Sequence, residues 1–373
     1  MFTINSPKVS TNILSSSAFT PSTMTQIAVN YAKQGGKWIY CNFPETYTES
    51  QIVTANGGYV FNKVDITGTK PHQVFFSYQT QQATKDTYFN IQVKNTGTTP
   101  ITLTVTNKGI YHTLDSAFSS VANADLWSAV SGESWRDFFA GCNETITIPV
   151  GGSKWIVQNV RKPKNAGLIT GNVRFNMGNA ANKATVYVYM ADAAGRSGIG
   201  KSPVTYTNEK YYSGYSDGYM LSANVSVKAS ELSSKKCIYL NYPSGIKNMK
   251  IDNTSVTSDL LKLTLTNGTV VSSSTSGQNL GNWGTQYIFN LTLENDTSTS
   301  KKFNVYLRTA VSGGAKDYPV LMSGSNFCYA NMQAQAWKWL TITVPANTKK
   351  TDSFQYILGT NSCDKKEMIF EVV

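Results

Sequence analysis

Residues Lys37–Pro44 read Lys-Trp-Ile-Tyr-Cys-Asn-Phe-Pro, and residues Lys236–Pro243 read Lys-Cys-Ile-Tyr-Leu-Asn-Tyr-Pro. Both stretches keep the pattern Ile-Tyr-x-Asn-aromatic-Pro. Successive side chains of such a stretch lie on opposite faces of a β-strand, and the proline ends the strand because it has no N–H for the ladder. The copies differ where a shared ligand site would have to agree, since Trp38 is replaced by Cys237. We therefore interpret the stretch as scaffold.

Two further blocks recur in the same order and at nearly the same spacing. Phe89–Asn95 returns as Phe289–Asn295, and Thr145–Pro149 returns as Thr341–Pro345. Three blocks in one order indicate a tandem duplication. A chain of 373 residues gives each copy enough length to bury a hydrophobic core of its own.

The composition is typical of an all-β, turn-rich protein, with 40% hydrophobic and 15% charged residues. The sequence predicts two tandem Ig-like β-sandwich domains, each with a short helical insert, and an extended N-terminal arm. We expect the arm over residues 1–23, the first domain over 24–195, a tyrosine-rich linker over 196–218 and the second domain over 219–373.

Each copy holds a stretch that looks less extended than its neighbours. Residues 113–141 include Trp127 and Trp135, and residues 330–339 end in Trp337-Lys338-Trp339. We expect short helices in both stretches, each plugging one end of its sandwich. The second copy ends on Glu367–Val373, which we match to the last strand of the first copy.

The N-terminal arm has no counterpart in the second copy. Five apolar residues in its polar background are the candidates for docking, namely Phe2, Ile4, Val9, Ile13 and Leu14. Two interpretations stay open. The arm is either a loose terminus or an extended segment that adds a strand to the sheet of a neighbouring chain.

The chain has five cysteines: Cys41, Cys142, Cys237, Cys328 and Cys363. No Cys-x-x-Cys pair occurs and the chain has two histidines, so a zinc or iron–sulfur site is not expected. Outside the cell, the odd count would leave one thiol free or bonded to a neighbouring chain, whereas inside the cell all five could be reduced, so the count does not fix the compartment. We therefore treat all five as candidates for structural or intermolecular disulfides, and the connectivity stays open.

The formal charge of +11 is spread over both halves, which is typical of a solvated surface. It could also favour anionic cell-wall polymers or glycans, whereas no nucleic-acid-binding motif accompanies it. No apolar run is long enough to span a membrane. Residues 2–23 do not resemble a signal peptide, so we expect either a leader removed before residue 1 or another route to the destination.

No pattern indicates an active site. His72 and His112 have no nearby partner suited to metal binding or nucleophilic catalysis, and no glycine-rich phosphate loop is present. We predict a protein that is not an enzyme and has no cofactor. Seven aromatic residues are candidates for a sugar-binding platform or for core packing: Trp127, Trp135, Trp337, Trp339, Tyr211, Tyr212 and Tyr215.

Five motifs follow one another in a recognisable order, namely Gly36–Glu45, Phe89–Asn95, Val105–Gly109, Ile146–Gly151 and Val173–Phe175. This succession resembles a β-sandwich domain of secreted Firmicutes surface proteins. That domain often accompanies a stalk domain, also called the copper amine oxidase N-terminal domain. The resemblance covers residues 24–195 and, more faintly, 219–373, and it implies architecture and location without chemistry. The present chain lacks the stalk module.

These features favour a structural protein of the bacterial cell or spore surface. Copies of the chain would associate head to tail into a layer, fibre or appendage, through the arm and the edges of the sandwiches. An adhesin or carbohydrate-binding module displayed on the surface is the alternative.

Overall fold

A computed structural model gives the structure of the chain. It describes residues 1–19, 25–27, 29–42, 46–47, 52, 58–80, 84–112, 124–162, 167–203, 213–232, 236–241, 263–265, 270–271, 283–309, 316–360, 362 and 366–373. The described part is all-β apart from one α-helix and short 3-10 turns, as the composition predicts. It forms two compact units. Unit 1 comprises Met1–Gln34, Met220–Leu260 and Leu280–Val373, and unit 2 comprises Gly35–Tyr219 and Leu261–Asn279.

Unit 1 consists mainly of two six-stranded sheets. The first, here called the arm sheet, has the order β1 (Ile13–Ser15), β25 (Gln335–Val344), β20 (Lys301–Thr309), β27 (Lys366–Val372), β16 (Lys236–Asn241) and β2 (Thr25–Gln26). The second, here called the opposing sheet, has the order β23 (Asn326–Tyr329), β22 (Pro319–Ser323), β26 (Thr348–Leu358), β19 (Gln286–Asn295), β15 (Met220–Lys228) and β3 (Ala32–Gln34). A small ladder joins β21 (Lys316–Asp317) to β24 (Met332–Gln333). The two larger sheets pack together through rings such as Trp339 and Phe354, whose centroids are 4.6 Å apart.

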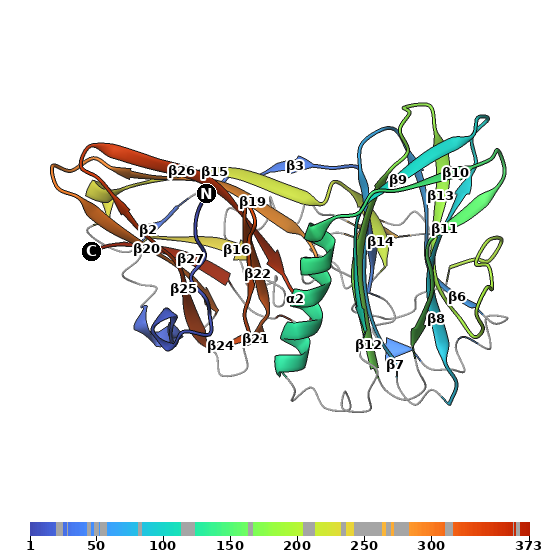
Figure 1. Ribbon diagram of the computed structural model, residues 1–373, viewed down its shortest axis with the longest axis horizontal. Helices are drawn as coiled ribbons and strands as arrows, with labels where there is room; N and C mark the ends of the chain where they lie inside the picture. The colour runs from blue at the N-terminus through green and yellow to red at the C-terminus, as the bar shows by residue number, and fades with distance from the viewer. Residues whose placement is uncertain are drawn as a thin grey trace. The chain divides into compact units, whose positions relative to one another are not determined.

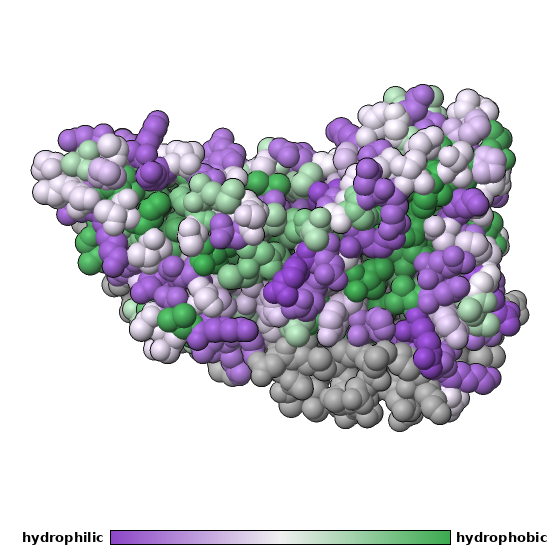
Figure 2. Space-filling view, in the orientation of Figure 1, coloured by the Kyte–Doolittle hydropathy of each residue, from purple (hydrophilic) through white to green (hydrophobic). Residues whose placement is uncertain are grey.

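Unit 2 also packs two sheets around one core. The larger has the order β10 (Glu144–Ile148), β9 (Ile101–His112), β12 (Gly167–Asn176), β7 (His72–Thr80), β4 (Lys37–Cys41), β14 (Gly214–Asp217), β17 (Leu263–Leu265) and β18 (Val270–Val271), with β5 (Thr46–Tyr47) also on β7. The smaller has the order β11 (Ser153–Lys162), β8 (Thr87–Asn95), β13 (Lys183–Ala191) and β6 (Gly58–Thr67). Stacked rings such as Phe76 and Phe89, 4.0 Å apart, join the sheets. On the face shown in Figure 2, apolar and hydrophilic residues are interspersed.

Helix α2 (Ala124–Ala140) confirms the helical insert predicted in the first copy. It lies against β9 and β12 (Figure 1). The approach is close because position 109 is glycine, where an added Cβ would lie 1.9 Å from the carbonyl oxygen of Ser134. The Ser134 hydroxyl donates to the Gly109 carbonyl at 3.1 Å. On this helix Trp135 is buried, with 2% of its surface exposed.

The helix predicted over residues 330–339 is wrong. These residues form β24 and the start of β25, which pairs with β20 on one side and with β1 on the other. The apolar-polar-apolar order of Trp337-Lys338-Trp339 is the period of a strand, and burial follows it, since both tryptophans are buried and Lys338 is partly exposed. A helix there would remove the strand partner of Tyr306–Arg308 in β20 on the β25 side.

The repeated stretches do not occupy equivalent places in the two units. β4 pairs in parallel with β7, whereas β16 pairs antiparallel with β27. The C-terminal strand β27 pairs with β20 as β12 pairs with β9, so the expected match of residues 367–373 to the last strand of the first copy is wrong. That last strand, β13, lies antiparallel to β8, and β15 takes its place beside β19 in a parallel arrangement.

The compact units also differ from the expected domain boundaries. Residues 25–34, expected in the first domain, supply β2 and β3 to unit 1. Part of the expected linker forms β14, which extends the sheet of unit 2 beside β4. β17, from the second half of the chain, pairs with β14 in unit 2. Each unit is thus completed by strands from outside its own repeat, because an open sheet edge accepts a strand whatever its position in the sequence.

A buried asparagine closes the same corner in both units. The Asn95 side-chain amide donates to the carbonyls of Thr99 (2.8 Å) and Ile148 (3.1 Å). The Asn295 amide donates to Thr299 (2.8 Å) and Val344 (2.9 Å). Each amide ties a hairpin turn to the end of a third strand. Asn95 and Asn295 are both fully buried, so their recurrence reflects a structural requirement.

We predict that Asn295→Ala lowers the free energy of unfolding of unit 1 by about 2 kcal/mol, because the hydrogen bonds from the buried amide to the Thr299 and Val344 carbonyls are lost. Asn95→Ala should have a similar effect on unit 2. Urea denaturation followed by circular dichroism measures both. Asn224→Ala is the control, since Asn224 is exposed and accepts one hydrogen bond, from Asn290. Equal stability of all three variants would contradict the role given to the corner.

Candidate assembly site at the N-terminal arm

The described N-terminal segment, Met1–Phe19 and here called the arm, lies along β25 at the edge of the arm sheet (Figure 1). Its first two residues reach the opposing sheet. The Met1 ammonium pairs with Asp352 at 2.6 Å, and the Phe2 N–H donates to Ser323 Oγ at 3.2 Å. The start of the arm therefore bridges the two sheets of unit 1.

An aromatic contact holds this bridge in the interior. The Phe2 ring meets Trp339 edge to face, with centroids 6.4 Å apart. Phe2 is 2% exposed, and Trp339 is fully buried. Ile4 is buried as well. Removing a phenylalanine ring from water contributes roughly 2–3 kcal/mol, so Phe2 stabilises the docked arm substantially.

Asn5 takes the place of a strand residue beside β25. Its backbone N–H donates to the Trp339 carbonyl at 2.7 Å, and its own carbonyl accepts from Trp337 Nε1 at 2.9 Å. Its side-chain amide donates to the Lys338 carbonyl at 3.2 Å. Asn5 thereby supplies partners to backbone and indole groups at the edge.

A short strand continues the pairing further along the arm. In β1, Ile13, Leu14 and Ser15 lie opposite Trp337, Ala336 and Gln335 in antiparallel register. Leu14 packs with a small cluster of buried residues, namely Phe19, Tyr306, Ala336 and Ile369. β1 is thus an edge strand: its backbone pairs with β25 on one side, and Leu14 packs on the apolar cluster.

The end of the arm caps a buried ion pair. Arg308 and Glu367 form this pair with 2% and 3% of their side chains exposed. The Arg308 guanidinium also donates to the carbonyls of Ser16 and Phe19. The Ser16 hydroxyl donates to the Thr309 carbonyl at 2.8 Å. Because a buried cation needs its N–H groups satisfied, the arm carbonyls help Arg308 to remain in the interior.

The arm therefore performs β-strand addition with the chemistry expected from the sequence, and the acceptor is its own chain. The alternative of a loose terminus is wrong for residues 1–19. Phe2 and Ile4 are buried, and Ile13 and Leu14 are partly buried, whereas Val9 is 49% exposed. Transfer of the arm to a neighbouring chain stays a prediction.

Sequence reasoning did not identify Asn5, Ser16, Phe19 or Arg308. Polar residues that donate to a backbone have no periodic signature, and an isolated arginine in a strand normally indicates a solvated surface. Phe19 was available as a signal, because it is one more apolar residue in the polar segment.

The aromatic candidates do not form one exposed platform. Trp135, Trp337 and Trp339 are buried, so their faces are not available to a sugar. Tyr215 is partly buried, and the Lys37 ammonium lies 4.7 Å from its ring centroid. The side chains of Trp127, Tyr211 and Tyr212 lie outside the described residues.

Three of the five cysteines can be placed in full. Cys41 is buried in the core of unit 2, and burial raises the pKa of its thiol to about 12. Its thiolate is therefore scarce at neutral pH, which disfavours a disulfide with another chain. Cys142 and Cys328 are partly exposed. The Cys237 side chain and Cys363 lie outside the described residues.

The two histidines lie in unit 2. His72 Nδ1 accepts the backbone N–H of Lys37 at 3.0 Å, and His72 is 1% exposed. Burial, with a smaller effect of the Lys37 charge, lowers the pKa of His72 to about 4. Burial also lowers the pKa of His112. Within the described part of the chain, no group of three or more His, Cys, Asp or Glu residues is arranged to hold a metal ion.

Where the helix is described, it does not have the length and apolar character needed to cross a membrane.

No family model matches the chain. No curated protein matches it either. Among solved structures, Lac15 from a marine microbial metagenome is 9% identical with a TM-score of 0.13, over 79% of this chain and 50% of Lac15. The PBSX exported protein XepA is 9% identical with a TM-score of 0.15, over 86% and 87%. The CBM22-1–CBM22-2 tandem domain of Paenibacillus barcinonensis Xyn10C is 9% identical with a TM-score of 0.14, over 92% and 91%. Likeness at this level does not bear on function.

Phe2→Ala should lower the free energy of unfolding of unit 1 by about 3 kcal/mol, because a buried ring leaves a void beside Trp339. Water entering this void should shift tryptophan emission to longer wavelength. Val9→Ala is the matched control on the exposed side of the arm and should change stability by less than about 0.5 kcal/mol. Urea titration followed by fluorescence tests both, and equal behaviour of the two variants would contradict the docked arm.

His72 should make unit 2 less stable in acid. Its pKa of about 4 in the folded chain lies below the ordinary value near 6.5, so the unfolded chain binds the extra proton first as the pH falls. The stabilisation is fully present above about pH 6.5 and is lost by roughly 3 kcal/mol as the pH falls to about 4. His72→Asn, which keeps an acceptor for Lys37, should flatten this slope in urea titrations between these pH values.

His112→Asn is the control for that experiment, and it should change the slope less because His112 is only partly buried. An unchanged slope in the His72 variant would show that other groups set the acid sensitivity.

Proposed function

We propose that this chain is a structural protein of the bacterial cell or spore surface, and that it assembles by placing its arm on the β25 edge of a neighbouring copy. The observation that carries the proposal is the docking of the arm itself. A terminal segment supplies backbone hydrogen bonds, a buried ring and partners for a buried arginine to an otherwise open sheet edge. The same contacts made in trans would link chains head to tail.

The energetic argument is that exchange changes few contacts. An arm that leaves its own β25 and occupies an identical edge next door recovers every contact, so the equilibrium depends on protein concentration and on the strain of the connection. An edge left empty would expose Trp337 and Trp339 and leave the Arg308 side of the sheet uncovered. Every copy in an assembly would therefore need one arm, which favours chains in which each copy gives one arm and receives one.

The tandem sandwich and the composition support the same proposal. A scaffold of two β-sandwich units suits a repeating subunit, and the resemblance to secreted surface domains supports an extracellular location. The positive charge is compatible with contact to anionic cell-wall polymers. The partner proposed for the arm is a second copy of this chain.

Cysteine trapping tests the exchange. Ser15 and Gln335 are opposite one another in the β1–β25 register, where Cα atoms are about 4.5–5.5 Å apart and a disulfide is sterically allowed. Ser15→Cys chains and Gln335→Cys chains, each also carrying Cys142→Ser and Cys328→Ser, are mixed in urea, refolded together at high concentration and oxidised. We expect a covalent dimer on non-reducing gels, and reductant should convert this dimer to monomers.

The matched control replaces Ser15→Cys by Ser17→Cys. Ser17 is also exposed but has no partner in the register, so its mixture should stay monomeric. The double variant Ser15→Cys/Gln335→Cys should give a ladder of covalent oligomers. Only internally linked monomers from the double variant, with no dimer from the mixture, would overturn the proposal.

A further inference from the structure

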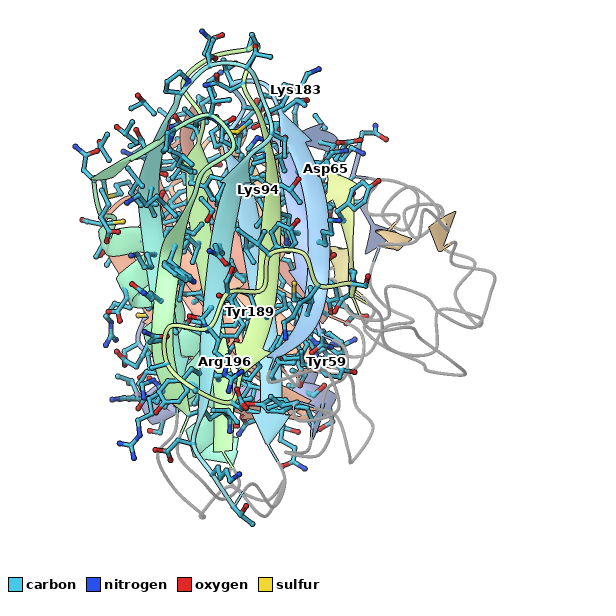
Figure 3. All side chains as sticks on the ribbon, turned by 90° about the vertical axis from the view of Figure 1, so that its right-hand side faces the viewer. Tyr59, Asp65, Lys94, Lys183, Tyr189 and Arg196 are labelled. Atoms are coloured by element: carbon cyan, nitrogen blue, oxygen red, sulfur yellow. The ribbon has the colours of Figure 1, made fainter. Side chains whose placement is uncertain are left out.

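The outer face of the β11-β8-β13-β6 sheet holds a basin of about 420 Å³. Six residues define its chemistry, namely Lys63, Asp65, Lys94, Lys183, Thr185 and Tyr187. Figure 3 looks onto this sheet, with Asp65, Lys94 and Lys183 toward one end of the strands and Tyr189 and Arg196 toward the other. The basin belongs entirely to unit 2.

Strand register fixes how the charges are arranged. Asp65, Thr185 and Lys94 form one row across β6, β13 and β8, and Lys63 lies opposite Tyr187 in the next row. Lys183 lies two residues before Thr185, on the other side of that row. With strands about 4.8 Å apart and alternate residues about 6.7 Å apart, the three lysine Cα atoms form a triangle with sides of roughly 8–14 Å.

The lysine ammonium groups dominate the charge of the basin. Among the described residues, neither Lys94 nor Lys183 has a carboxylate within 4.0 Å. The Lys63 ammonium lies 5.8 Å from the centroid of the Tyr187 ring. The Thr185 hydroxyl donates to Asp65 Oδ1 at 2.6 Å, which holds the single carboxylate against the sheet. The basin therefore offers three cations, one fixed acceptor and an aromatic edge.

One end of this face is covered by the chain itself. The Tyr189 hydroxyl donates to the Arg196 carbonyl at 2.8 Å and accepts from Trp155 Nε1 at 2.8 Å. The Gly198 backbone packs so closely on Tyr189 that a Cβ would lie 2.6 Å from the ring. Ile199 packs on the same cluster. The segment after β13 thus closes one end of the face, and the lysine basin at the other end stays open.

We infer that this basin binds an acidic glycan chain. Ammonium groups at these separations can meet anionic groups on successive sugars, and the Asp65 carboxylate can accept from sugar hydroxyls. The volume is in the range of small-ligand sites, and because the basin is open on the sheet face, a polymer chain can extend beyond it on both sides. This binding site shares no residue with the arm, so glycan binding can be tested independently of assembly.

Affinity measurement with defined polymers tests the inference. The probes are a galacturonate oligomer, whose anionic group is a carboxylate, dextran sulfate, and neutral dextran. We expect calorimetry at low salt to show binding of at least one acidic glycan and none of dextran. Lys94→Ala/Lys183→Ala should weaken binding at least tenfold. The matched control, Lys349→Ala/Lys350→Ala on exposed positions of β26, removes the same charge and should change affinity less than twofold.

Two further results separate recognition from plain charge attraction. Asp65→Ala should weaken glycan binding, because the hydroxyl acceptor is lost, whereas attraction by net charge alone would strengthen it. Tighter binding of this variant, or equal losses in the two double-lysine variants, would overturn the inference. Tighter binding of a single-stranded DNA oligonucleotide than of either acidic glycan would also overturn it. Circular dichroism of every variant confirms that the sheets are retained.

Discussion

The open edge of β25 is the constraint on which unit 1 depends. An edge strand exposes unpaired N–H and C=O groups, and here the same strand carries two tryptophans that must leave water. The arm satisfies both needs at once, with Asn5 and β1 on the backbone and Phe2 against Trp339. Because one segment meets polar and apolar demands together, losing it affects the sheet, the core and the buried ion pair.

The duplicated sequence produces the same asparagine-closed corner in both units, but two different sheet topologies. Asn95 and Asn295 make the same pair of hydrogen bonds at the same corner, so the repeat preserves the hairpin and the strand that follows it. Around this common part, β4 and β16 take different neighbours despite their similar residues. A strand sequence specifies which face is buried, whereas the choice of partner edge depends on what the rest of the chain leaves open.

Strands from remote segments complete both units, and the proposed assembly would use the same strand addition between copies. β2 and β3 join strands of the second half in unit 1, and β17 joins β14 in unit 2. A chain that fills its own sheet edges with distant segments already uses the interaction that would join one copy to the next. The lysine basin lies on a sheet face instead of an edge, so glycan contact and arm exchange would not compete for the same groups.

The sequence by itself determined the all-β class, the duplication and the first helical insert, because alternation, repeats and apolar spacing are local properties. For the arm, the sequence left open a loose terminus and a strand-adding segment. Only the tertiary structure decided where the arm docks, that residues 335–344 form a strand, and which lysines share a basin. Trp337 and Trp339 show the reason. Their i, i+2 spacing is the period of a strand, but the stretch is too short for this alternation to decide the structure alone, and the neighbours β20 and β1, distant in sequence, fix the strand.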